Sequence, residues 1–549
     1  MSETSAPLEI TETSGARQQA LADCGLILLA AVAACFLFLG QNADWAPREA
    51  RHGVIAAEMA QSGDYFVPRL LGELYEYKPP VLHALAAVLF NLFGGPSMLL
   101  LRLPLAVAAC CGALALCFLG RILFNRETGL FASLALLGSQ GFAHWSHTAR
   151  PDMIFAAALV GQSLGLVAGM AAAPLTPCGP PSIPPRGEGR VRGLPCFFLA
   201  GVVGGVALLT KGPYGISYVG LFALALILAA PWGRQDLRRP RLPELAIFGL
   251  GLVLLPLAWA LPIYLRGDMG YLRLLFSQYN PAAGIRHRHG VDYYFVHGLA
   301  GVLPWALFLP LAVKDIKKQR ALTVFVAAIF AVFSCIPSKE ERYLLPWYPF
   351  AVLLLTAPLV RRFEVRWLRN ACLVLLLLGL AAPPVYYGLL LPRQSRENPQ
   401  VQAFATLAVK SVPAGSAIHC LGGIGETVGF MAYALRAPGE VLVTATPDQE
   451  EPSALAIQRA ELRAVAAQRV TSGKSFFVVV KEGKLQGIQA FFPEAPLERI
   501  AGLRVQQQAG HQSIPWLLCR VPLDAATAAK IKEQAKPSPR GMAPEPGED

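Results

Sequence analysis

The few charged residues of this sequence gather in short connectors that separate long apolar stretches. Only 15% of the 549 residues are charged and 54% are hydrophobic, a composition too apolar for a soluble globular protein. Apolar runs about as long as a bilayer-spanning helix recur through residues 1–392. The first run, 21–40, is not followed by a small-residue cleavage site, so it is predicted to remain as a membrane helix. The sequence therefore predicts a polytopic α-helical membrane protein.

Eleven stretches are long enough, or nearly so, to cross a bilayer as helices. They are residues 21–40, 98–120, 127–146, 153–173, 195–210, 213–231, 244–265, 293–313, 321–337, 343–360 and 370–391. A further apolar stretch, 81–94, is shorter and is bounded by Pro79-Pro80 and Gly94-Gly95-Pro96. It could cross the bilayer, lie in the interface or merge with the next helix.

The basic residues predict the orientation of these helices, because Lys and Arg concentrate in cytoplasmic connectors. If 81–94 does not cross and the N-terminus is cytoplasmic, every strongly basic connector falls inside. These connectors are 121–126, 186–192, 234–241, 314–320 and 361–369. The segments predicted to lie outside are then 41–97, 147–152, the surroundings of 211, 266–292, 338–342 and everything after 392.

The composition changes after the last apolar stretch. Residues 393–525 are predicted to form an external α/β domain, and the Lys-, Pro- and Glu-rich residues 526–549 a disordered tail. Strands are expected at 416–421, 440–446, 475–481 and 514–521, with a helix at 454–468. Cys420 and Cys519 fall in two of these strands, and whether they pair is left open because sequence does not show the distance between them.

Polar side chains recur in the outer connectors. The net charge of +12 is spread over connectors without a basic, aromatic-interleaved stripe, which argues against a nucleic-acid partner. At helix ends, such groups can hold a lipid phosphate while its chain stays in the bilayer; alternatively, the first loop is an interfacial helix with solvated charges, and Asp152 a simple helix cap. The candidate residues are Asp44, Glu49, Arg51, Tyr75, Lys78, Arg150, Asp152, Lys211, Arg286, Lys339, Arg342 and Tyr343.

A series of short motifs, in order from about residue 44 to 350, resembles the bacterial lipid A aminoarabinose transferases and their dolichyl-phosphate-mannose protein mannosyltransferase relatives. The motifs are Glu49-Ala50-Arg51-His52, Ser62-Gly63-Asp64, Lys78-Pro79-Pro80, Arg102-Leu103-Pro104, Arg150-Pro151-Asp152, Lys211-Gly212-Pro213, Leu303-Pro304-Trp305 and Arg342-Tyr343-Leu344-Leu345-Pro346. The resemblance implies a GT-C-type glycosyltransferase domain over 1–392, with 11–13 helices and a large first periplasmic loop at 41–97.

The resemblance also implies a reaction. A sugar would pass, with inversion, from an undecaprenyl-phosphate carrier to a lipid A-like lipid or a protein at the periplasmic face of the bacterial inner membrane. Such chemistry needs a base for the acceptor proton and cations for the departing phosphate. It needs no nucleotide; no cofactor is implied with certainty, no metal ligands are assigned, and a divalent metal ion is left open.

The implied roles follow the family motifs. Glu49 and Asp152 form the acidic pair, with Asp44 as a possible substitute, while Lys78, Arg51 and Arg342 hold the lipid phosphate. The sequence departs from the family at Arg48, where an Asp is usual before the Glu, and at Tyr77, where a Glu often precedes the Lys. These departures put the identity of the base in question and leave the phosphate side intact.

Two other functions are compatible with parts of the pattern. A transporter or flippase of an anionic lipid-linked sugar would also line its helices with cations, but such proteins place polar groups near the midplane, often within inverted repeats. A sensor or scaffold using the external domain would leave the charged connectors unexplained. The position of the polar residues therefore favours the transferase.

Overall fold

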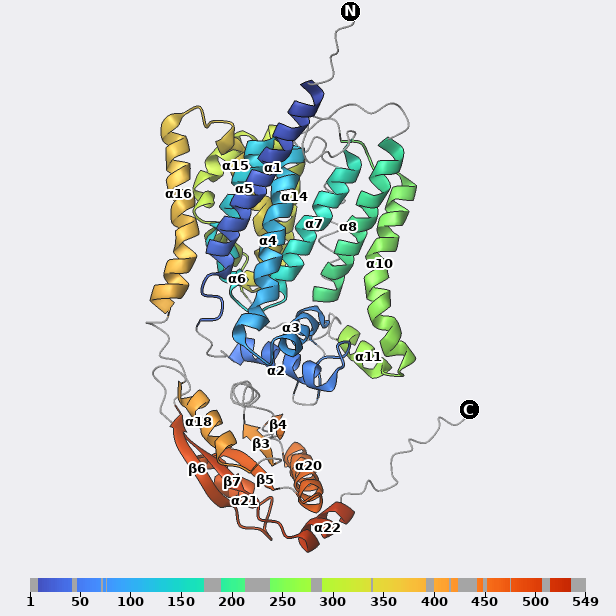
Figure 1. The fold of residues 1–549 in the computed structure, drawn as a ribbon, viewed down its shortest axis with the longest axis vertical. Coiled ribbons are helices and arrows are strands. Elements are labelled where there is room, and N and C mark those ends of the chain that lie inside the picture. Colours follow the sequence, from blue (N-terminus) through green and yellow to red (C-terminus); the bar gives the residue numbers. More distant parts are fainter. Residues whose placement is uncertain are drawn as a thin grey trace, which may run out of the picture. The chain divides into compact units, whose positions relative to one another are not determined.

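The computed structural model describes residues 8–41, 47–70, 73–75, 77–171, 189–212, 237–277, 289–336, 339–391, 399–413, 416–422, 442–447, 452–473, 475–505 and 514–534. They fall into two compact units (Figure 1). The first comprises residues 1–43, 59–68 and 74–394, and the second comprises residues 44–58, 69–73 and 395–549.

In the described part of the first unit, eight helical segments are long and apolar enough to cross a membrane. These are Arg17–Phe36, Met98–Leu123, Asp152–Met170, Gly193–Lys211, Leu242–Leu265, Lys317–Cys335, Glu341–Val360 and Arg366–Leu390. The pair Tyr293–Gly301 and Trp305–Lys314 is bent by 107°, so it is either a broken ninth span or a re-entrant loop. The prediction of a polytopic helical membrane protein is confirmed.

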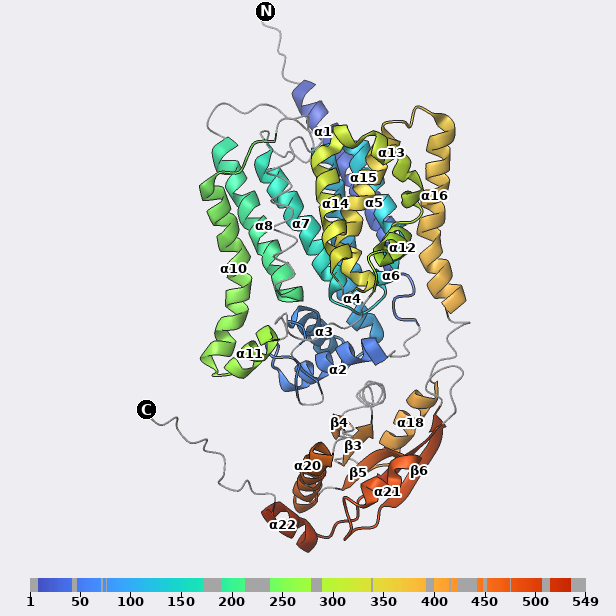
Figure 2. The same cartoon turned by 180° about the vertical axis from the view of Figure 1, so that it is seen from behind.

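The labelled helices of this unit follow the apolar stretches. They are α1 (Leu8–Ala31), η1 (Val32–Phe36), α3 (Val81–Leu92), α4 (Met98–Leu123), α5 (Arg126–Leu137), α6 (Gln140–Ser146), α7 (Asp152–Met170), α8 (Gly189–Lys211), α10 (Leu242–Leu265), α11 (Met269–Ser277), α12 (Tyr293–Gly301), η2 (Trp305–Phe308), α13 (Leu309–Lys314), η3 (Ile316–Gln319), α14 (Arg320–Cys335), η4 (Glu341–Trp347), α15 (Tyr348–Val360), α16 (Arg366–Val385) and η5 (Tyr386–Leu390). Helices α4, α7, α8 and α10 stand side by side in that order, as Figure 2 shows from behind.

Two expected spans are broken. The stretch 127–146 forms α5 and α6, which are separated at Gly138, where the carbonyl oxygen closely approaches Gly379 of α16. The stretch 293–313 is the bent pair that contains α12 and α13. The expected span 213–231 lies outside the described residues.

The short apolar stretch after Pro80 forms α3. Its 12 residues rise only about 18 Å, which is less than the roughly 30 Å of a hydrocarbon core. Helix α3 is thus too short to cross a bilayer by itself. This supports the assumption that residues 81–94 do not cross, on which the predicted orientation depends.

Close backbone contacts join α8 to α10. A Cβ atom on Gly201 would overlap the carbonyl oxygen of Phe248, and one on Gly251 would overlap that of Phe198. Glycines at such places let membrane helices approach each other and pack closely. Helices α8 and α10 can therefore lie this close only because Gly201 and Gly251 have no side chains.

We expect Gly201→Ala to destabilise the folded protein by about 1–3 kcal/mol, because the added methyl group forces α8 away from α10. Gly249→Ala is the matched control, since a Cβ on Gly249 meets nothing within 4 Å. The measurement is the fraction of monodisperse protein that survives heating in detergent. Equal losses in the two variants would contradict this account of the packing.

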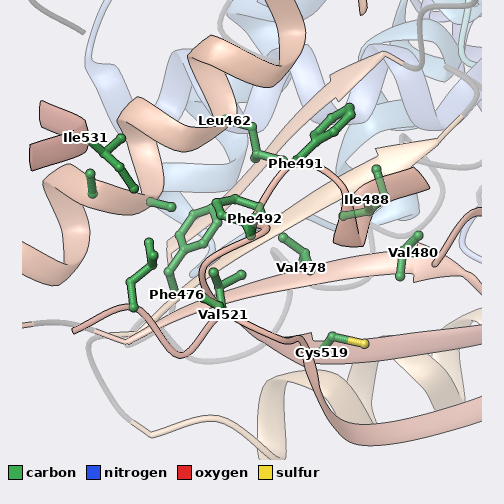
Figure 3. Packing of buried hydrophobic residues seen from close by; sticks show 14 of the residues in the cluster. Leu462, Phe476, Val478, Val480, Ile488, Phe491, Phe492, Cys519, Val521 and Ile531 are labelled. Carbon is green, nitrogen blue, oxygen red and sulfur yellow. The ribbon is translucent and has the colours of Figure 1, made fainter. Parts of the chain in front are cut away.

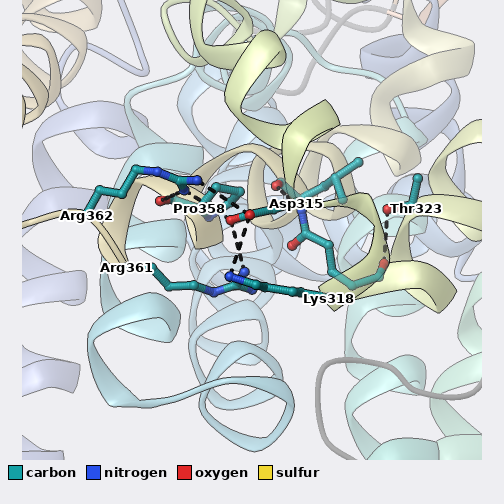
Figure 4. A network of polar contacts seen from close by, with 8 residues as sticks. Asp315, Lys318, Thr323, Pro358, Arg361 and Arg362 are labelled. Atoms are coloured by element: carbon teal, nitrogen blue, oxygen red, sulfur yellow. Dashed lines mark hydrogen bonds and ion pairs between the residues drawn. The ribbon is translucent and has the colours of Figure 1, made fainter.

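A buried carboxylate organises one of the basic connectors (Figure 4). The Asp315 side chain accepts from Arg361 at 3.1 Å and from Arg362 at 3.0 Å, and Lys318 lies 3.8 Å away. Burial alone would raise the pKa of Asp315, but Arg362, Arg361 and Lys318 outweigh it, so the pKa lies below its usual range. The Asp315 carboxylate is therefore kept ionised, so it can hold the basic side chains of the connector in place.

Two other basic connectors contain the same device. Arg126 donates to both oxygens of Asp23 on α1, at 2.7 and 2.8 Å, and Arg121 donates at 3.4 Å. Arg238 binds both oxygens of Glu244 at 2.7 Å. The Asp23 contacts join α1 to the end of α4 and the start of α5, and the bidentate Arg238–Glu244 pair holds the start of α10.

The second unit contains a five-stranded sheet with the order β4-β3-β5-β7-β6. Its strands are β3 (Ala417–Gly422), β4 (Leu442–Pro447), β5 (Phe476–Lys481), β6 (Glu498–Val505) and β7 (Ile514–Arg520). The strands β4, β3 and β5 are parallel, whereas β7 and β6 are antiparallel to their neighbours. The helical elements of this region are α18 (Pro399–Lys410), α20 (Pro452–Thr471), η6 (Glu482–Lys484), α21 (Leu485–Gln489) and α22 (Ala525–Gln534). A C-terminal α/β domain is confirmed, but α22 continues through residues 526–534, which were predicted to belong to a disordered tail.

Alternate residues of the central strand β5, Phe476, Val478 and Val480, point into one apolar core (Figure 3). Phe492 and Leu462, from the segment after α21 and from α20, pack against the same core. This alternation is what a strand with one face toward a core requires.

The strand order of this sheet shows whether Cys420 and Cys519 can form a disulfide. Cys420 lies on β3 and Cys519 on β7, and both strands pair with β5, which runs between them. Two strand spacings amount to about 9.5 Å, beyond the roughly 7 Å that a disulfide can bridge. Both thiols are free.

The first-loop segment contributes to both units. It forms α2 (Pro47–Ser62) and the two short strands β1 (Arg69–Leu70) and β2 (Glu73–Leu74). Residues 44–58 and 69–73 group with the second unit, whereas 59–68 group with the first.

Candidate functional site

Three segments of the first unit bring charged side chains together. Asp152 is the first residue of α7 and Lys211 is the last residue of α8. Because α7 and α8 pack against each other and α7 also contacts η4, Arg342 of η4 reaches the same place. The chain folds this way because each charge sits where an apolar helix begins or ends, so that it need not lie against lipid.

Asp152 and Lys211 form a buried ion pair. The Lys211 Nζ lies 2.6 Å from Asp152 Oδ1, and the two residues are only 6% and 3% exposed respectively. Arg342 Nε lies 3.8 Å from the same oxygen. Pro151, not Asp152, is the N-cap residue of α7, and the Asp152 carboxylate faces Lys211 and Arg342.

Arg342 is also held by a second carboxylate. Its Nη1 lies 2.5 Å from Glu340 Oε2, and its Nη2 donates to Glu340 Oε1 at 2.6 Å. This is the two-pronged geometry in which a guanidinium binds a carboxylate or a phosphate. Glu340 is absent from the residues that the sequence singled out.

Aromatic rings surround the cations. Lys211 Nζ lies 5.2 Å from the ring centres of both Phe155 and Tyr343, and the Arg342 guanidinium lies 5.3 Å from the Tyr343 ring. Ring faces attract cations at such distances. Phe155, one turn after Asp152, had no distinguishing sequence signal because it reads as an ordinary apolar residue of a membrane helix.

Lys78, in the turn before α3, belongs to the same electrostatic cluster. Burial lowers its pKa to about 8, and the charge of Lys211 acts in the same direction. Asp152 and Glu340 oppose this lowering, whereas Arg342 adds to it. The Tyr271 hydroxyl donates to the backbone carbonyl of Lys78 at 3.4 Å. Lys78 is therefore a cation that is costly to keep charged without an anion nearby.

Other predicted residues lie elsewhere in the first unit. The Tyr75 ring is buried and packs edge-on against His83 at 5.6 Å. Lys339 donates to the backbone carbonyls of Ile336 at 2.6 Å and His289 at 3.0 Å. Its ammonium thus fastens the end of α14 to the segment before α12. Arg150 is half-buried in the connector before α7.

The remaining predicted residues lie in the second unit or outside the described residues. Glu49 is buried in the first turn of α2, and Arg51 is half-buried in the same helix; both belong to the second unit. Asp44 and Arg286 lie outside the described residues. Their proposed roles stay predictions.

Within the described residues, no three His, Cys, Asp or Glu side chains come together in an arrangement that could hold a metal ion. The cluster that is present has three cations and two carboxylates, which is a composition suited to an anionic group such as a phosphate.

Two family models match parts of the chain. The model of dolichyl-phosphate-mannose-protein mannosyltransferase matches residues 77–172, and that of the Alg9-like mannosyltransferase family matches residues 272–407. The first match contains Lys78 and Asp152, and the second contains Arg342.

Curated proteins are also similar to this chain. An undecaprenyl phosphate-alpha-4-amino-4-deoxy-L-arabinose arabinosyl transferase of Aeromonas salmonicida is 28% identical over 64% of this chain and 65% of its own length. A protein of the same name from Yersinia enterocolitica is 28% identical over 57% of this chain and 55% of its own. The chain therefore aligns with less than two thirds of the length of each of these relatives.

The fold also matches solved structures. ArnT from Cupriavidus metallidurans in the apo state superposes with a TM-score of 0.65 at 16% identity, over 93% of this chain and 99% of that one. The same protein bound to undecaprenyl phosphate gives a TM-score of 0.65 over 92% and 98%. The predicted GT-C-type fold is confirmed, as is the resemblance to the aminoarabinose transferases and protein mannosyltransferases.

Proposed function

We propose that this chain, with its GT-C-type fold and its cluster of cations at helix ends, is a membrane glycosyltransferase that uses a polyprenyl-phosphate sugar donor. Its acceptor would be a lipid A-like lipid or a protein at the periplasmic face of a bacterial inner membrane. The relatives named for undecaprenyl-phosphate-linked arabinosyl transfer and the mannosyltransferase family matches support the reaction class. The observation that carries the proposal is the meeting of Lys78, Lys211 and Arg342 around Asp152.

In the proposed reaction these cations receive the phosphate of the donor. As the bond between the anomeric carbon and the phosphate oxygen breaks, negative charge grows on the phosphate. Cations that are already held in place stabilise that charge without having to reorganise. Asp152 keeps Lys211 and Arg342 oriented, since its Oδ1 faces both.

The acceptor side needs a carboxylate that can take the acceptor proton. Asp152 pairs with Lys211 at 2.6 Å, so it is poorly placed to accept a proton as well. We assign the base to Glu49 in the first turn of α2, with Asp44 as the second candidate. An attack from the side opposite the phosphate gives inversion.

The experiment that tests this function compares cells with and without the gene. Mass analysis of their lipid A and periplasmic glycoproteins should reveal a sugar that is present only when the gene is. The purified protein in nanodiscs should then transfer that sugar from its polyprenyl-phosphate donor to the same acceptor. Movement of the donor across the membrane without any covalent transfer would instead support a flippase and overturn the proposal.

Lys78→Ala should weaken use of the donor by about tenfold to a hundredfold, because one charge-assisted contact to a phosphate is lost. The pKa of Lys78 is about 8, so wild-type affinity for the donor should fall as the pH rises from 7 to 9 and the lysine loses its proton. Lys78→Arg is the matched control because arginine stays charged throughout this range. Donor affinity measured against pH in the three proteins is the test; wild-type affinity in Lys78→Ala would remove Lys78 from the mechanism.

A further inference from the structure

The two-pronged end of Arg342 is already occupied by an anion from the chain itself. Both Nη atoms contact the Glu340 carboxylate, at 2.5 and 2.6 Å. A phosphate that binds Arg342 through the same two atoms must therefore displace Glu340 or share the arginine with it. Glu340 stands where a phosphate would bind in the same geometry.

The backbone around Glu340 is fixed while its side chain is partly open to solvent. The Tyr294 hydroxyl donates to the Glu340 carbonyl at 3.0 Å, and the preceding Lys339 donates to two backbone carbonyls. The Glu340 side chain is 20% exposed and that of Arg342 is 15% exposed. A change at this position therefore requires only rotation of the Glu340 side chain.

The charges in the cluster are nearly balanced. Lys78, Lys211 and Arg342 supply three positive charges, and Asp152 and Glu340 supply two negative ones, all within electrostatic reach of Lys78. One positive charge remains. A phosphodiester with a single negative charge would neutralise it, whereas a phosphomonoester with nearly two would leave an excess negative charge in a partly buried place.

Glycosyl transfer changes the charge of the carrier in this way. The acceptor oxygen bonds to the anomeric carbon and gives its proton to the base, while the bond from that carbon to the phosphate oxygen breaks. The bonding electron pair stays on the phosphate. The carrier thus enters as a phosphodiester and remains as a phosphomonoester, with one more negative charge at neutral pH.

We propose that Glu340 is a specificity-determining residue that lets the site prefer the diester form of the carrier over the monoester form and so promotes departure of the spent carrier. This inference rests on the proposed function. Repulsion from the Glu340 carboxylate scales with ligand charge, so it acts about twice as strongly, in free energy, on the monoester as on the diester.

The test measures binding of two short probes, farnesyl phosphate and its methyl diester, to the full-length protein in nanodiscs at pH 7. Glu340→Gln should raise affinity about threefold for the diester and about tenfold for the monoester, the second factor being near the square of the first. Glu341→Gln is the matched control. It removes the same charge from the next residue, which is 49% exposed and pairs with His297 at 2.9 Å, and should change either affinity less than twofold.

A second measurement needs no variant. The second pKa of a phosphomonoester is about 6, so the wild-type preference for the diester should narrow at pH 5, where both probes carry one charge. Among the described residues, the charged and titratable groups around Glu340 are its neighbour Lys339, the Glu341–His297 pair, Lys78, Asp152, Arg342, Tyr293, Tyr294 and Tyr343. Histidine is the type among them that ordinarily titrates between pH 5 and 7, so Glu341→Gln is measured across the same interval.

The outcomes distinguish failure of the role of Glu340 from failure of the proposed transferase function. Equal gains for both probes in Glu340→Gln, equal gains in Glu341→Gln, or a wild-type preference that does not change with pH would each overturn the role of Glu340 and leave the transferase proposal standing. If the wild type binds neither probe, the phosphate site is wrong and both proposals fall.

Discussion

Replacing Glu49 by Gln should reduce turnover by about a hundredfold or more, while donor affinity stays within a few-fold of the wild type. The amide keeps the shape of the side chain but cannot take the acceptor proton, and a positioned general base typically contributes 10²–10⁴-fold. Glu49 is 8% exposed in the first turn of α2. The measurement is kcat and donor KM for protein that elutes as a single species in detergent.

Asp44→Asn is the paired variant for this experiment. If Asp44 is the base instead, it will be the inactive protein and Glu49→Gln will be nearly normal. Near-normal transfer by both amides, and also by Asp152→Asn, would mean that no carboxylate of these connectors takes the proton. The proposed acceptor chemistry would then have to be abandoned.

Asp152→Asn should cost about 3–5 kcal/mol of folded-state stability, because it leaves the buried ammonium of Lys211 without its partner at 2.6 Å. Transfer should also fall steeply, since Arg342 loses the same carboxylate. Thermal unfolding in detergent measures the first effect, and the transfer assay measures the second.

The double variant Asp152→Asn with Lys211→Met tests the reason for this loss. Removing the unpaired cation should restore much of the stability but none of the activity, because a residue that receives the phosphate is gone. If Asp152→Asn alone is as stable as the wild type, Asp152 is not a structural counterion. In that case the ion pair would not be what holds α7 to α8 at this end.

The sequence predicted which connectors would share a face, and Lys78, Asp152, Lys211, Arg342 and Tyr343 do come together. The number of preceding membrane helices and the distribution of Lys and Arg are enough to predict the shared face, since each residue lies at the end of an apolar stretch. Sequence did not predict how the charges pair. Asp152 was predicted as one of two acidic residues of the site, with a helix cap as the alternative, and the structure pairs it with a lysine 59 positions along the chain.

The second failure concerns neighbouring residues of like charge. Glu340 and Glu341 form a doublet in the sequence, but only Glu340 turns toward Arg342, while Glu341 pairs with His297. The Lys339 ammonium donates to two backbone carbonyls, contacts that its sequence position did not indicate, and its predicted role in binding the substrate stays a prediction. The direction of a side chain in an irregular connector depends on its tertiary neighbours, which a single sequence does not reveal.

The sheet of the second unit shows a similar limit. Four strands were expected within two residues of their observed bounds, because they are rich in β-branched and apolar residues. The edge strand β6, Glu498–Val505, was missed. Its charged residues and Gly502 weaken the strand signal, and the register shifts between Arg499 and Ala501, as is common where an edge is protected from pairing.

The buried carboxylates Asp23, Glu244 and Asp315 have a consequence for the biogenesis of the protein. While helices are being inserted, acidic residues contribute little to orientation, and Lys and Arg near the helix ends dominate it. The arginines that later bind Asp23 and Asp315 would at that time act as free cations. After the helices have assembled, the same guanidinium groups are neutralised by partners from other helices. With the predicted orientation, one set of side chains would serve first to orient the nascent helices and afterwards to join them.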